Sequence, residues 1–247
     1  MTTAGAVHSI ACESEPLFKF YAMRRTREEP AAAAEAAAVA QASRGVRSAK
    51  QLRSQRKHDA LLQAGRALLD GGDLASISVS QLTRAAGMAV GSFYSRFADK
   101  DAWFGELVRV TGEAVLHDTR TLLSSARFQR APDARKVGLI VRHIVAIHRH
   151  HRGIFRAALN DGARPSRYAA PVRDYGQQLG AAVQQALAAR LLKVPHPQRR
   201  LRVGIALQIV YGTLVNAVLR DPGPIRLDDG RMERELTRVF LDCVRLG

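Results

Sequence analysis

From Gln55 onward, apolar residues recur at the spacing of an α-helix over most of the chain. The apolar positions of the first segment are Leu61, Ala64, Gly65, Leu68 and Leu69. They share one face, because residues three and four apart are neighbours on a helix, and Gly71-Gly72 then forms a stop signal. No segment shows the alternation of apolar and polar residues that is typical of a half-buried strand. The pattern predicts an all-α fold.

A second helix is predicted to begin at Ser78. Ser78 and Gln81 have the spacing of a capping box, in which each side chain bonds to the backbone N–H of the other residue. The apolar face of this helix consists of Val79, Leu82 and Ala86. Gly87 follows, and glycine commonly ends a helix.

A short third helix is predicted over about residues 89–96. Phe93 and Phe97 are four residues apart and so point into the core together. Gly91 and Ser92 carry little bulk, which suits a helix whose backbone must come close to another molecule. Asp99 is a good N-cap for a fourth helix. Two short helices joined by a tight turn indicate a helix-turn-helix, and the partner expected is double-stranded DNA.

These patterns divide the chain into three parts. Residues 1–50 contain the low-complexity alanine tract 31–42, which has no hydrophobic face to bury, and are predicted to be a disordered extension. Residues 51–100 are predicted to form the helix-turn-helix DNA-binding domain. Residues 101–247 are predicted to form a larger helical domain for ligand binding and dimerisation.

The formal net charge of +16 predicts affinity for polyanions. This charge is unevenly distributed, because residues 55–115 hold seven basic and seven acidic residues whereas residues 116–247 hold 23 and 10. Most of the excess therefore lies outside the predicted helix-turn-helix. We interpret it as arginines on solvated helix faces rather than as a second nucleic-acid surface.

Several classes of protein are not supported. Cys12 and Cys243 are the only cysteines, which indicates a reducing cytoplasm and no disulfide framework. No apolar run approaches the length that crosses a bilayer, so we expect no membrane partner. The chain has no glycine-rich phosphate loop, nucleophile elbow or string of metal ligands, so we expect no enzyme and no cofactor.

Four histidines lie close together in sequence and are candidate metal ligands: His143, His148, His150 and His151. His143 and His150 are seven residues apart and share a helix face, but no cysteine or acidic residue nearby completes a ligand shell. We therefore predict no metal site. The preferred interpretation is a solvated basic helix end, where histidine and arginine suit the helix dipole.

The residues from Ala86 to Lys100 resemble the signature of the TetR family of bacterial transcription regulators, A-G-[VM]-[SA]-x-G-[TS]-[FL]-Y-x-[HR]-F-x-[SD]-K. The resemblance implies a ligand-responsive DNA-binding regulator, most often a repressor, that binds a palindromic operator as a homodimer. The chain departs from the family at Val90, where many members have a polar residue, and at Arg96, where histidine is frequent. Gly65 replaces the usual alanine, at a cost of about 0.5–1 kcal/mol of local stability.

The third helix is expected to lie in a major groove, where base edges can be distinguished. The DNA-binding residues predicted on this basis are Arg56, Lys57, Ser78, Val90, Gly91, Ser92, Tyr94, Ser95 and Lys100. Within this set, Gly91 permits close backbone approach and Val90 can touch a thymine methyl group. Tyr94 and Lys100 are expected to contact phosphates.

The larger domain is expected to hold a small-molecule effector and the dimer contact. The aromatic residues predicted to line an effector cavity are Trp103, Phe104, Phe128, Phe155, Tyr175 and Tyr211. Residues 199–220 are apolar almost all round, so that helix must be buried on two sides. Together with the stripe in residues 229–246, it is the predicted four-helix interface between two protomers.

Two other interpretations remain open. One is a basic architectural protein that coats DNA without sequence choice, whose binding would weaken steeply with salt on any duplex. The other is a helical protein that binds or converts a small molecule and has lost DNA binding. Effector, operator and regulated genes are not indicated by the sequence.

Overall fold

The computed structural model describes residues 49–159, 168–188 and 196–245 of the chain. Except for its last two residues, the extension predicted over residues 1–50 lies outside the described residues. The chain divides into two compact units, residues 1–53 and 54–247. Its described residues form helices joined by turns and loops, which confirms the all-α prediction.

The first helices are α3 (Ala49–Gly71), α4 (Val79–Ala85) and α5 (Val90–Tyr94), with a 3₁₀ turn, η2 (Leu74–Ser76), between α3 and α4. The predicted end of α3 at Gly71 is confirmed. At the start of α4 the capping box is present, because the Ser78 hydroxyl accepts from the Gln81 N–H and the Gln81 side chain accepts from the Ser78 N–H. Local sequence signals therefore set these boundaries. Helix α5 is shorter than the predicted 89–96.

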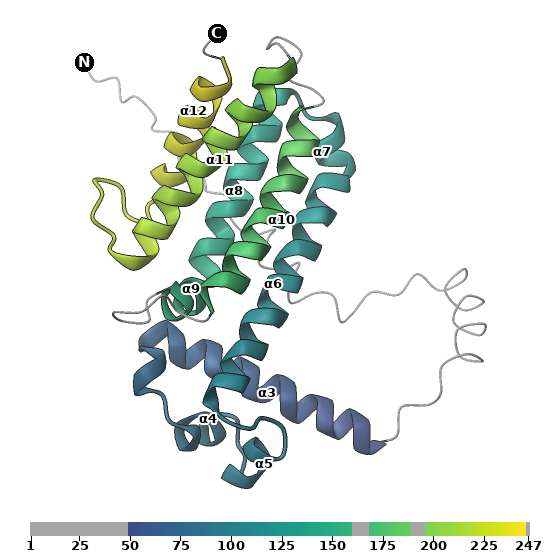
Figure 1. The fold of residues 1–247 in the computed structure, drawn as a ribbon, viewed down its shortest axis with the longest axis vertical. Helices are drawn as coiled ribbons and strands as arrows, with labels where there is room; N and C mark the ends of the chain where they lie inside the picture. The colour runs from purple at the N-terminus through teal and green to yellow at the C-terminus, as the bar shows by residue number, and fades with distance from the viewer. Residues whose placement is uncertain (1–48, 160–167, 189–195, 246–247) are drawn as a thin grey trace, which may run out of the picture. The chain divides into compact units, whose positions relative to one another are not determined.

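The remaining helices are α6 (Lys100–Ser124), α7 (Ala126–Arg130), α8 (Asp133–His150), α9 (Arg152–Leu159), α10 (Ala169–Ala188), α11 (His196–Leu219) and α12 (Arg231–Arg245). As predicted, Asp99 caps α6, its carboxylate accepting from the Ala102 N–H at 2.7 Å. Figure 1 shows the long helices α6, α8, α10, α11 and α12 lying side by side as a bundle. Helix α7, only five residues long, was not predicted.

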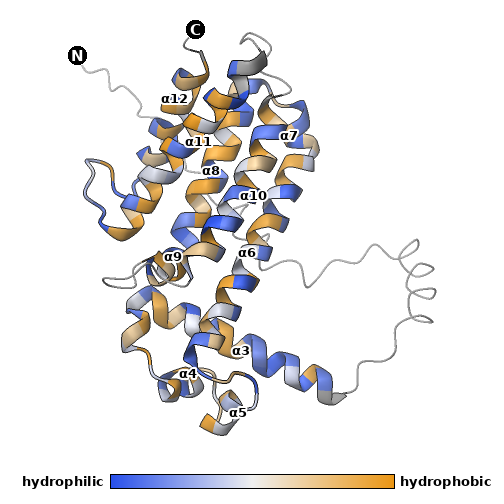
Figure 2. Cartoon of the chain, in the orientation of Figure 1, coloured by the Kyte–Doolittle hydropathy of each residue, from blue (hydrophilic) through white to orange (hydrophobic). Residues whose placement is uncertain are grey.

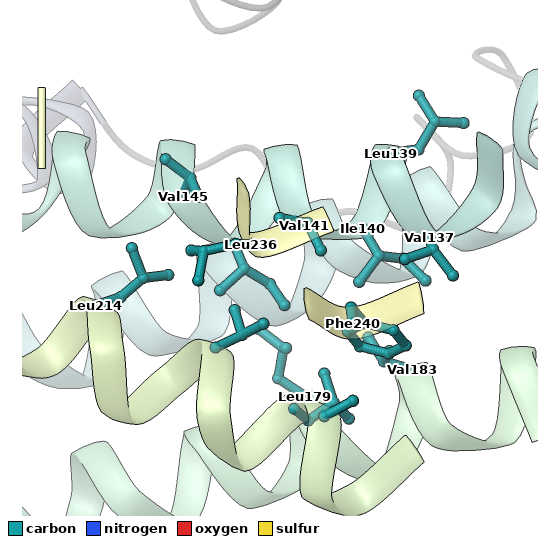
Figure 3. Close-up of a cluster of buried hydrophobic side chains, with 14 of the residues drawn as sticks. Val137, Leu139, Ile140, Val141, Val145, Leu179, Val183, Leu214, Leu236 and Phe240 are labelled. Atoms are coloured by element: carbon teal, nitrogen blue, oxygen red, sulfur yellow. The ribbon is translucent and has the colours of Figure 1, made fainter. Parts of the chain in front are cut away.

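Two clusters of buried side chains hold these helices together. The head cluster comprises Leu61, Leu62, Leu69, Ile77, Leu82, Phe93, Phe97, Trp103, Phe104, Leu107, Val108, Ile154, Ala158 and Tyr168. The bundle cluster is larger and joins α6, α7, α8, α10, α11 and α12 with the loop before α12; Figure 3 shows its centre, where Val141, Leu236 and Phe240 lie close together. Helix α6 contributes to both clusters, and α9 contributes to the head cluster. The domain boundary predicted at residue 100 stays a prediction.

Helix α11 buries only one of its faces within the chain. Residues Val203, Ala206, Leu207, Val210 and Leu214 are buried in the bundle cluster. Leu201, Ile205 and Ile209 are exposed on the same helix, and Val239 is exposed on α12. Figure 2 shows how apolar residues extend over much of α11. The second buried side that the sequence predicted is therefore absent within the described part of the single chain.

The expectation that no apolar run approaches bilayer length is wrong for this helix. Residues Arg200–Leu219 are long and apolar enough, by length and composition alone, to cross a membrane. One such helix is weak support for a membrane span, because a helix of a protein core passes the same test. Since Val203, Val210 and Leu214 are fully buried against neighbouring helices, one face of α11 belongs to the core of the bundle.

Candidate nucleic-acid interface

The outer face of α5 is not covered by the rest of the described chain. Val90 is 42% exposed and Tyr94 is 58% exposed, whereas Phe93 and Phe97 on the inner face are buried. The Phe93 and Phe97 rings lie 5.4 Å apart between centroids and anchor α5 in the head cluster. A Cβ placed on Gly91 would meet no atom within 4 Å. The helix thus offers a slim, accessible surface.

The turn before α5 is a helix C-cap that reverses the chain. Gly87 has φ of +66°, a left-handed conformation that favours glycine. Its N–H donates to the Arg84 carbonyl at 3.1 Å, and the Met88 N–H donates to the Thr83 carbonyl at 2.8 Å. This pair of bonds is a Schellman motif. It ends α4 and brings α5 against it, so the two helices form a helix-turn-helix.

The serines predicted to contact DNA differ in how free their hydroxyls are. The Ser78 hydroxyl both accepts from the Gln81 N–H and donates to the Gln81 carboxamide oxygen at 2.9 Å. The Ser95 hydroxyl donates to the Ser92 carbonyl at 3.0 Å and accepts from Arg96 at 2.9 Å. The Ser92 hydroxyl makes no hydrogen bond with any described residue, so it is the serine most available to a base edge.

Arg96 ties the end of α5 to α3. Its Nη1 donates to the Ser92 carbonyl at 2.8 Å, and its Nη2 donates to the Ser54 hydroxyl at 3.4 Å. Arg56 and Lys57, both exposed, lie within one turn of Ser54. The first predicted phosphate ligands on α3 therefore lie near the end of α5.

Lys100 contacts backbone carbonyls of the chain itself. Its ammonium donates to the carbonyls of Leu74 at 2.9 Å, Ala75 at 3.4 Å and Ile77 at 3.0 Å. A lysine has three N–H donors, so these contacts use all of them. The prediction of a free ammonium directed at a phosphate is thus not supported by this geometry. Lys100 instead joins the start of α6 to the connection between α3 and α4.

The six aromatic residues predicted to line one cavity fall into different places. Trp103 and Phe104 are fully buried in the head cluster, and the Trp103 indole N–H donates to the Leu61 carbonyl at 3.3 Å. Phe128 is buried in the bundle cluster beneath the Lys136 ammonium, 5.9 Å from the ring centroid. These three side chains pack in the core, Phe128 in a different cluster from Trp103 and Phe104, which gives no support to a single cavity lined by all six.

Phe155 and Tyr211 do come together, on either side of His148. The Phe155 ring stacks on the His148 imidazole at 4.9 Å between centroids, and the Tyr211 ring lies 6.0 Å from it. The Tyr211 hydroxyl is buried and has no hydrogen-bond partner among the described residues. Burial raises the pKa of this phenol above its usual value. Tyr175 packs elsewhere, with its ring on Gly112 of α6.

The interpretation of the histidines as a solvated helix end is wrong for His148 and His151, whereas His150 is exposed. His148 and His151 are buried. The His148 Nδ1 lies 2.8 Å from the Ile144 carbonyl, which only accepts, so Nδ1 carries the proton. Burial lowers the pKa of His143 and of His148 to about 4, and that of His151 to about 3, so these rings are neutral. In the described ranges no cluster of His, Cys, Asp or Glu could hold a metal ion.

Two arginines that join distant segments could not be identified from any local pattern. Arg149 donates to the carbonyls of Leu227 and Asp229 and pairs with Glu233 at 2.8 Å, which ties α8 to the start of α12. Arg156 of α9 donates to the carbonyls of Leu69 and Gly72. The partners of both side chains lie about eighty residues away along the chain, beyond the reach of any local pattern.

Two family models match the chain. Residues 61–107 match the model described as bacterial regulatory proteins of the tetR family, and residues 134–243 match that of the tetracyclin repressor-like C-terminal domain. The first covers the helix-turn-helix, and the second covers α8 to α12 except for the ends. No curated protein sequence matches.

Solved structures share the fold at low sequence identity. A putative TetR-family transcriptional regulator from Mesorhizobium loti is 18% identical, covers 78% of this chain and 97% of its own, and has a TM-score of 0.64. A TetR-family regulator from Streptomyces coelicolor is 15% identical over 76% and 79%, with a TM-score of 0.53. The fatty acid degradation regulator FadR from Bacillus halodurans is 16% identical over 78% and 93%, with a TM-score of 0.51.

The family matches bear on the same elements as the geometry. An exposed short helix on a Schellman turn lies within the residues of the N-terminal model, and the helical bundle lies within those of the C-terminal model. TetR-family regulators bind DNA through this helix-turn-helix and are not enzymes. The chain therefore belongs to the TetR family of DNA-binding transcriptional regulators.

Proposed function

We propose that the protein is a repressor that binds a palindromic operator as a homodimer and is released by a small-molecule effector. The observation that carries the proposal is the accessible outer face of α5, where Val90 and Tyr94 are exposed and Gly91 has open space above it. A repressor acts on chromosomal DNA, so the cytoplasm remains its predicted location.

The proposed base contacts come from the first turn of α5. Val90 supplies an apolar surface for a thymine methyl group, Gly91 lets the backbone approach, and the Ser92 hydroxyl donates to or accepts from a base edge. Tyr94 lies one turn further on, with its phenol free to reach a phosphate oxygen. The remaining proposed phosphate contacts are Arg56, Lys57, Ser78 and Ser95. Lys100 is assigned a different role below.

The proposed dimer contact is the uncovered face of α11 and α12. Leu201 is 64% exposed and Ile205 is 44% exposed, and with Ile209 they repeat every four residues along one side of α11. Contiguous apolar surface of this kind is expensive to leave in water. A second copy that presents the same face would cover it by twofold symmetry and form a four-helix interface.

The proposed effector site lies where α8, α9 and α11 meet. Phe155, His148 and Tyr211 bring aromatic rings together there. The buried Tyr211 hydroxyl supports the presence of a ligand or a water, because an unpaired buried hydroxyl costs about 1–3 kcal/mol. Trp103, Phe104 and Phe128, which are fully buried, are not proposed members of the site, and neither is Tyr175, whose ring lies on Gly112 of α6.

Selection from a random duplex library with the purified full-length protein tests this function. The expected result is a shared inverted repeat, with half-sites about one helical turn or a multiple apart. The Gly91→Val protein is the matched control, because its change lies only on the outer face of α5. If the recovered duplexes share no sequence and binding depends only on salt, the protein is not a sequence-specific repressor. That result would favour an architectural protein that binds DNA without sequence specificity.

A further inference from the structure

The connection between α3 and α4 is held by a cation from α6. This connection, residues 72–78, contains one short 3₁₀ turn, so most of its carbonyls have no partner within a helix. The Lys100 ammonium donates to the carbonyl oxygens of Leu74, Ala75 and Ile77 at 2.9, 3.4 and 3.0 Å. Three carbonyls within four residues are thereby fixed to the first turn of α6.

A second cation holds the other end of the same connection. Arg156 Nη2 donates to the carbonyl of Leu69 at 2.8 Å and to that of Gly72 at 3.1 Å, and Nε lies 3.6 Å from the Asp73 carboxylate. Leu69 is in the last turn of α3, where carbonyls have no partner further along the helix. Arg156 therefore caps α3 from a helix that lies about eighty residues further along the chain.

The backbone of α9 comes close enough to α3 for this contact because position 153 is glycine. A Cβ on Gly153 would lie 2.5 Å from the Leu69 carbonyl oxygen and 2.9 Å from the Asp70 nitrogen. These are backbone atoms, which cannot turn aside as a side chain can. Ile154 and Ala158, on the same helix, are buried in the head cluster.

Helix α9 also contacts the proposed effector site. Phe155, next to Arg156 in sequence, stacks on His148 of α8. His151, just before α9, lies 3.3 Å from Arg66 of α3 through its Nδ1. Helix α9, two turns long, thus contacts the α3–α4 connection through Arg156 and the His148 ring of α8 through Phe155.

We propose that Lys100 and Arg156 are positioning residues for sequence recognition, and that neither contacts DNA. Together they fix the α3–α4 connection, which ends at Ser78, the N-cap of α4, and α4 in turn packs on α5. Displacement of this connection moves the helix that supports α5. The inference rests on the proposed role of α5 in sequence recognition.

Variants at four positions test the proposal in the full-length protein. Lys100→Met and Arg156→Met remove the two cations while keeping an unbranched apolar side chain in place of the aliphatic stem. Lys57→Met removes a proposed phosphate ligand on α3. Arg152→Met is the matched control on α9, because Arg152 pairs with Asp228 in the loop before α12 and does not touch the connection. The probes are the duplex recovered by selection and a random duplex of equal length, each measured from low to high salt.

Positioning and phosphate contact predict different results. Lys100→Met and Arg156→Met are expected to lower the ratio of affinities for the selected and random duplexes by about tenfold or more, since a misplaced α5 loses base contacts. The slope of log affinity against log salt on the random duplex should not change. Lys57→Met should reduce that slope by about 1.8, because both protomers of the dimer lose a phosphate contact worth about 0.9 each, and keep the ratio. Arg152→Met should change neither.

Two outcomes overturn the inference. A fall of about 1.8 in the salt slope with Lys100→Met or Arg156→Met, two contacts of about 0.9 in the dimer, would make that residue a phosphate ligand. An unchanged affinity ratio in both variants would leave the two cations with a structural role only. Lys100→Arg, which keeps the charge and the donors, is expected to restore the ratio if Lys100→Met lowers it.

Hydrogen exchange without DNA separates this proposal from the proposed function. The amide protons of Gln81 and Leu82, which donate to Ser78, are expected to exchange faster in Lys100→Met and Arg156→Met than in Arg152→Met, because the start of α4 is less firmly held. Equal exchange in all three variants would contradict the inference. If selection recovers no duplex, the proposed function fails, whereas the exchange measurement and the salt slope on the random duplex still decide between positioning and phosphate contact.

Discussion

The indole ring of Trp103 occupies the space beside Gly65 that a side chain would otherwise fill. A Cβ at position 65 would overlap Cζ2 of the ring. The indole N–H donates to the Leu61 carbonyl, one turn earlier on α3. Gly65, which was expected only to lower the stability of α3, therefore makes room for the Trp103 ring of α6.

Gly65→Ala is expected to destabilise the protein, although alanine favours helix. Overpacking against the buried Trp103 should cost about 1–3 kcal/mol, which exceeds the gain in helix propensity. Gly176→Ala is the control, since its Cβ meets nothing within 4 Å, and it should stabilise by about 0.4–1 kcal/mol. Urea unfolding of both variants measures the difference. A more stable Gly65→Ala protein would show that the indole can move aside at little cost.

Gly91→Val is expected to abolish specific DNA binding without harming the fold. The position is exposed, helical and surrounded by open space, so the free energy of unfolding should change by less than about 1 kcal/mol. The added branch on the outer face of α5 should lower affinity for the selected duplex by about tenfold or more, because it holds the backbone away from the groove. Filter binding measures the affinity for the selected duplex, and urea unfolding measures the stability of the fold. Normal affinity would exclude α5 from the major groove.

Ile205→Glu is expected to convert a dimer to a monomer. The substitution places a charge at the centre of the exposed apolar stripe of α11, where dimer formation would have to bury it unpaired. Light scattering should give twice the chain mass for the unaltered protein and the single chain mass for the variant. Gln178→Glu, a similar change at an exposed position on α10, should leave the mass at the dimer value. A variant that stays dimeric would place the interface elsewhere.

The protein is expected to lose stability on acidification at pH values well above those at which carboxylates titrate. His143, His148 and His151 have a lowered pKa when folded, about 4, 4 and 3, because they are buried, while unfolded histidine titrates near 6.5. Below pH 6.5 the unfolded state takes up protons that the folded state cannot. Stability from these groups is thus full above pH 6.5 and falls towards pH 4, by roughly 1.4 kcal/mol per pH unit for each histidine.

Urea unfolding at several pH values between 7.5 and 4 measures this slope. His143→Gln keeps a polar group within reach of Thr119, whose hydroxyl lies 2.9 Å from the His143 Nε2. The unfolding free energy of the variant should fall less steeply as the pH is lowered, because its unfolded state takes up one proton fewer. The same slope in both proteins would mean that His143 is protonated as readily in the folded state as in the unfolded one.

The parts of the fold that local chemistry determines were predictable from sequence. The capping box at Ser78, the left-handed Gly87 and the Asp99 cap each depend on residues within four positions of one another. For the same reason the helix-turn-helix and its exposed face could be placed before the structure was known. The boundaries follow from hydrogen bonds that the backbone must satisfy close by.

What could not be predicted depends on partners far away in sequence. Lys100 resembles a phosphate ligand at a helix start until the carbonyls of Leu74 and Ile77 are seen to surround it. His148 has the composition of a solvated helix end, yet α11 and Phe155 cover it. Periodicity shows that a helix has an apolar face, but not which element will cover that face or what polar groups are buried with it.

Trp103 is the only tryptophan in the chain, and it is fully buried in the head cluster. Its emission therefore reports on the surroundings of the DNA-reading helices and on nothing in the bundle cluster. Far-ultraviolet circular dichroism, in contrast, averages over all helices. Unfolding curves from the two signals coincide if both clusters melt in one cooperative step and separate if the head cluster opens first. The chain thus carries a built-in spectroscopic probe of whether its two cores are one thermodynamic unit.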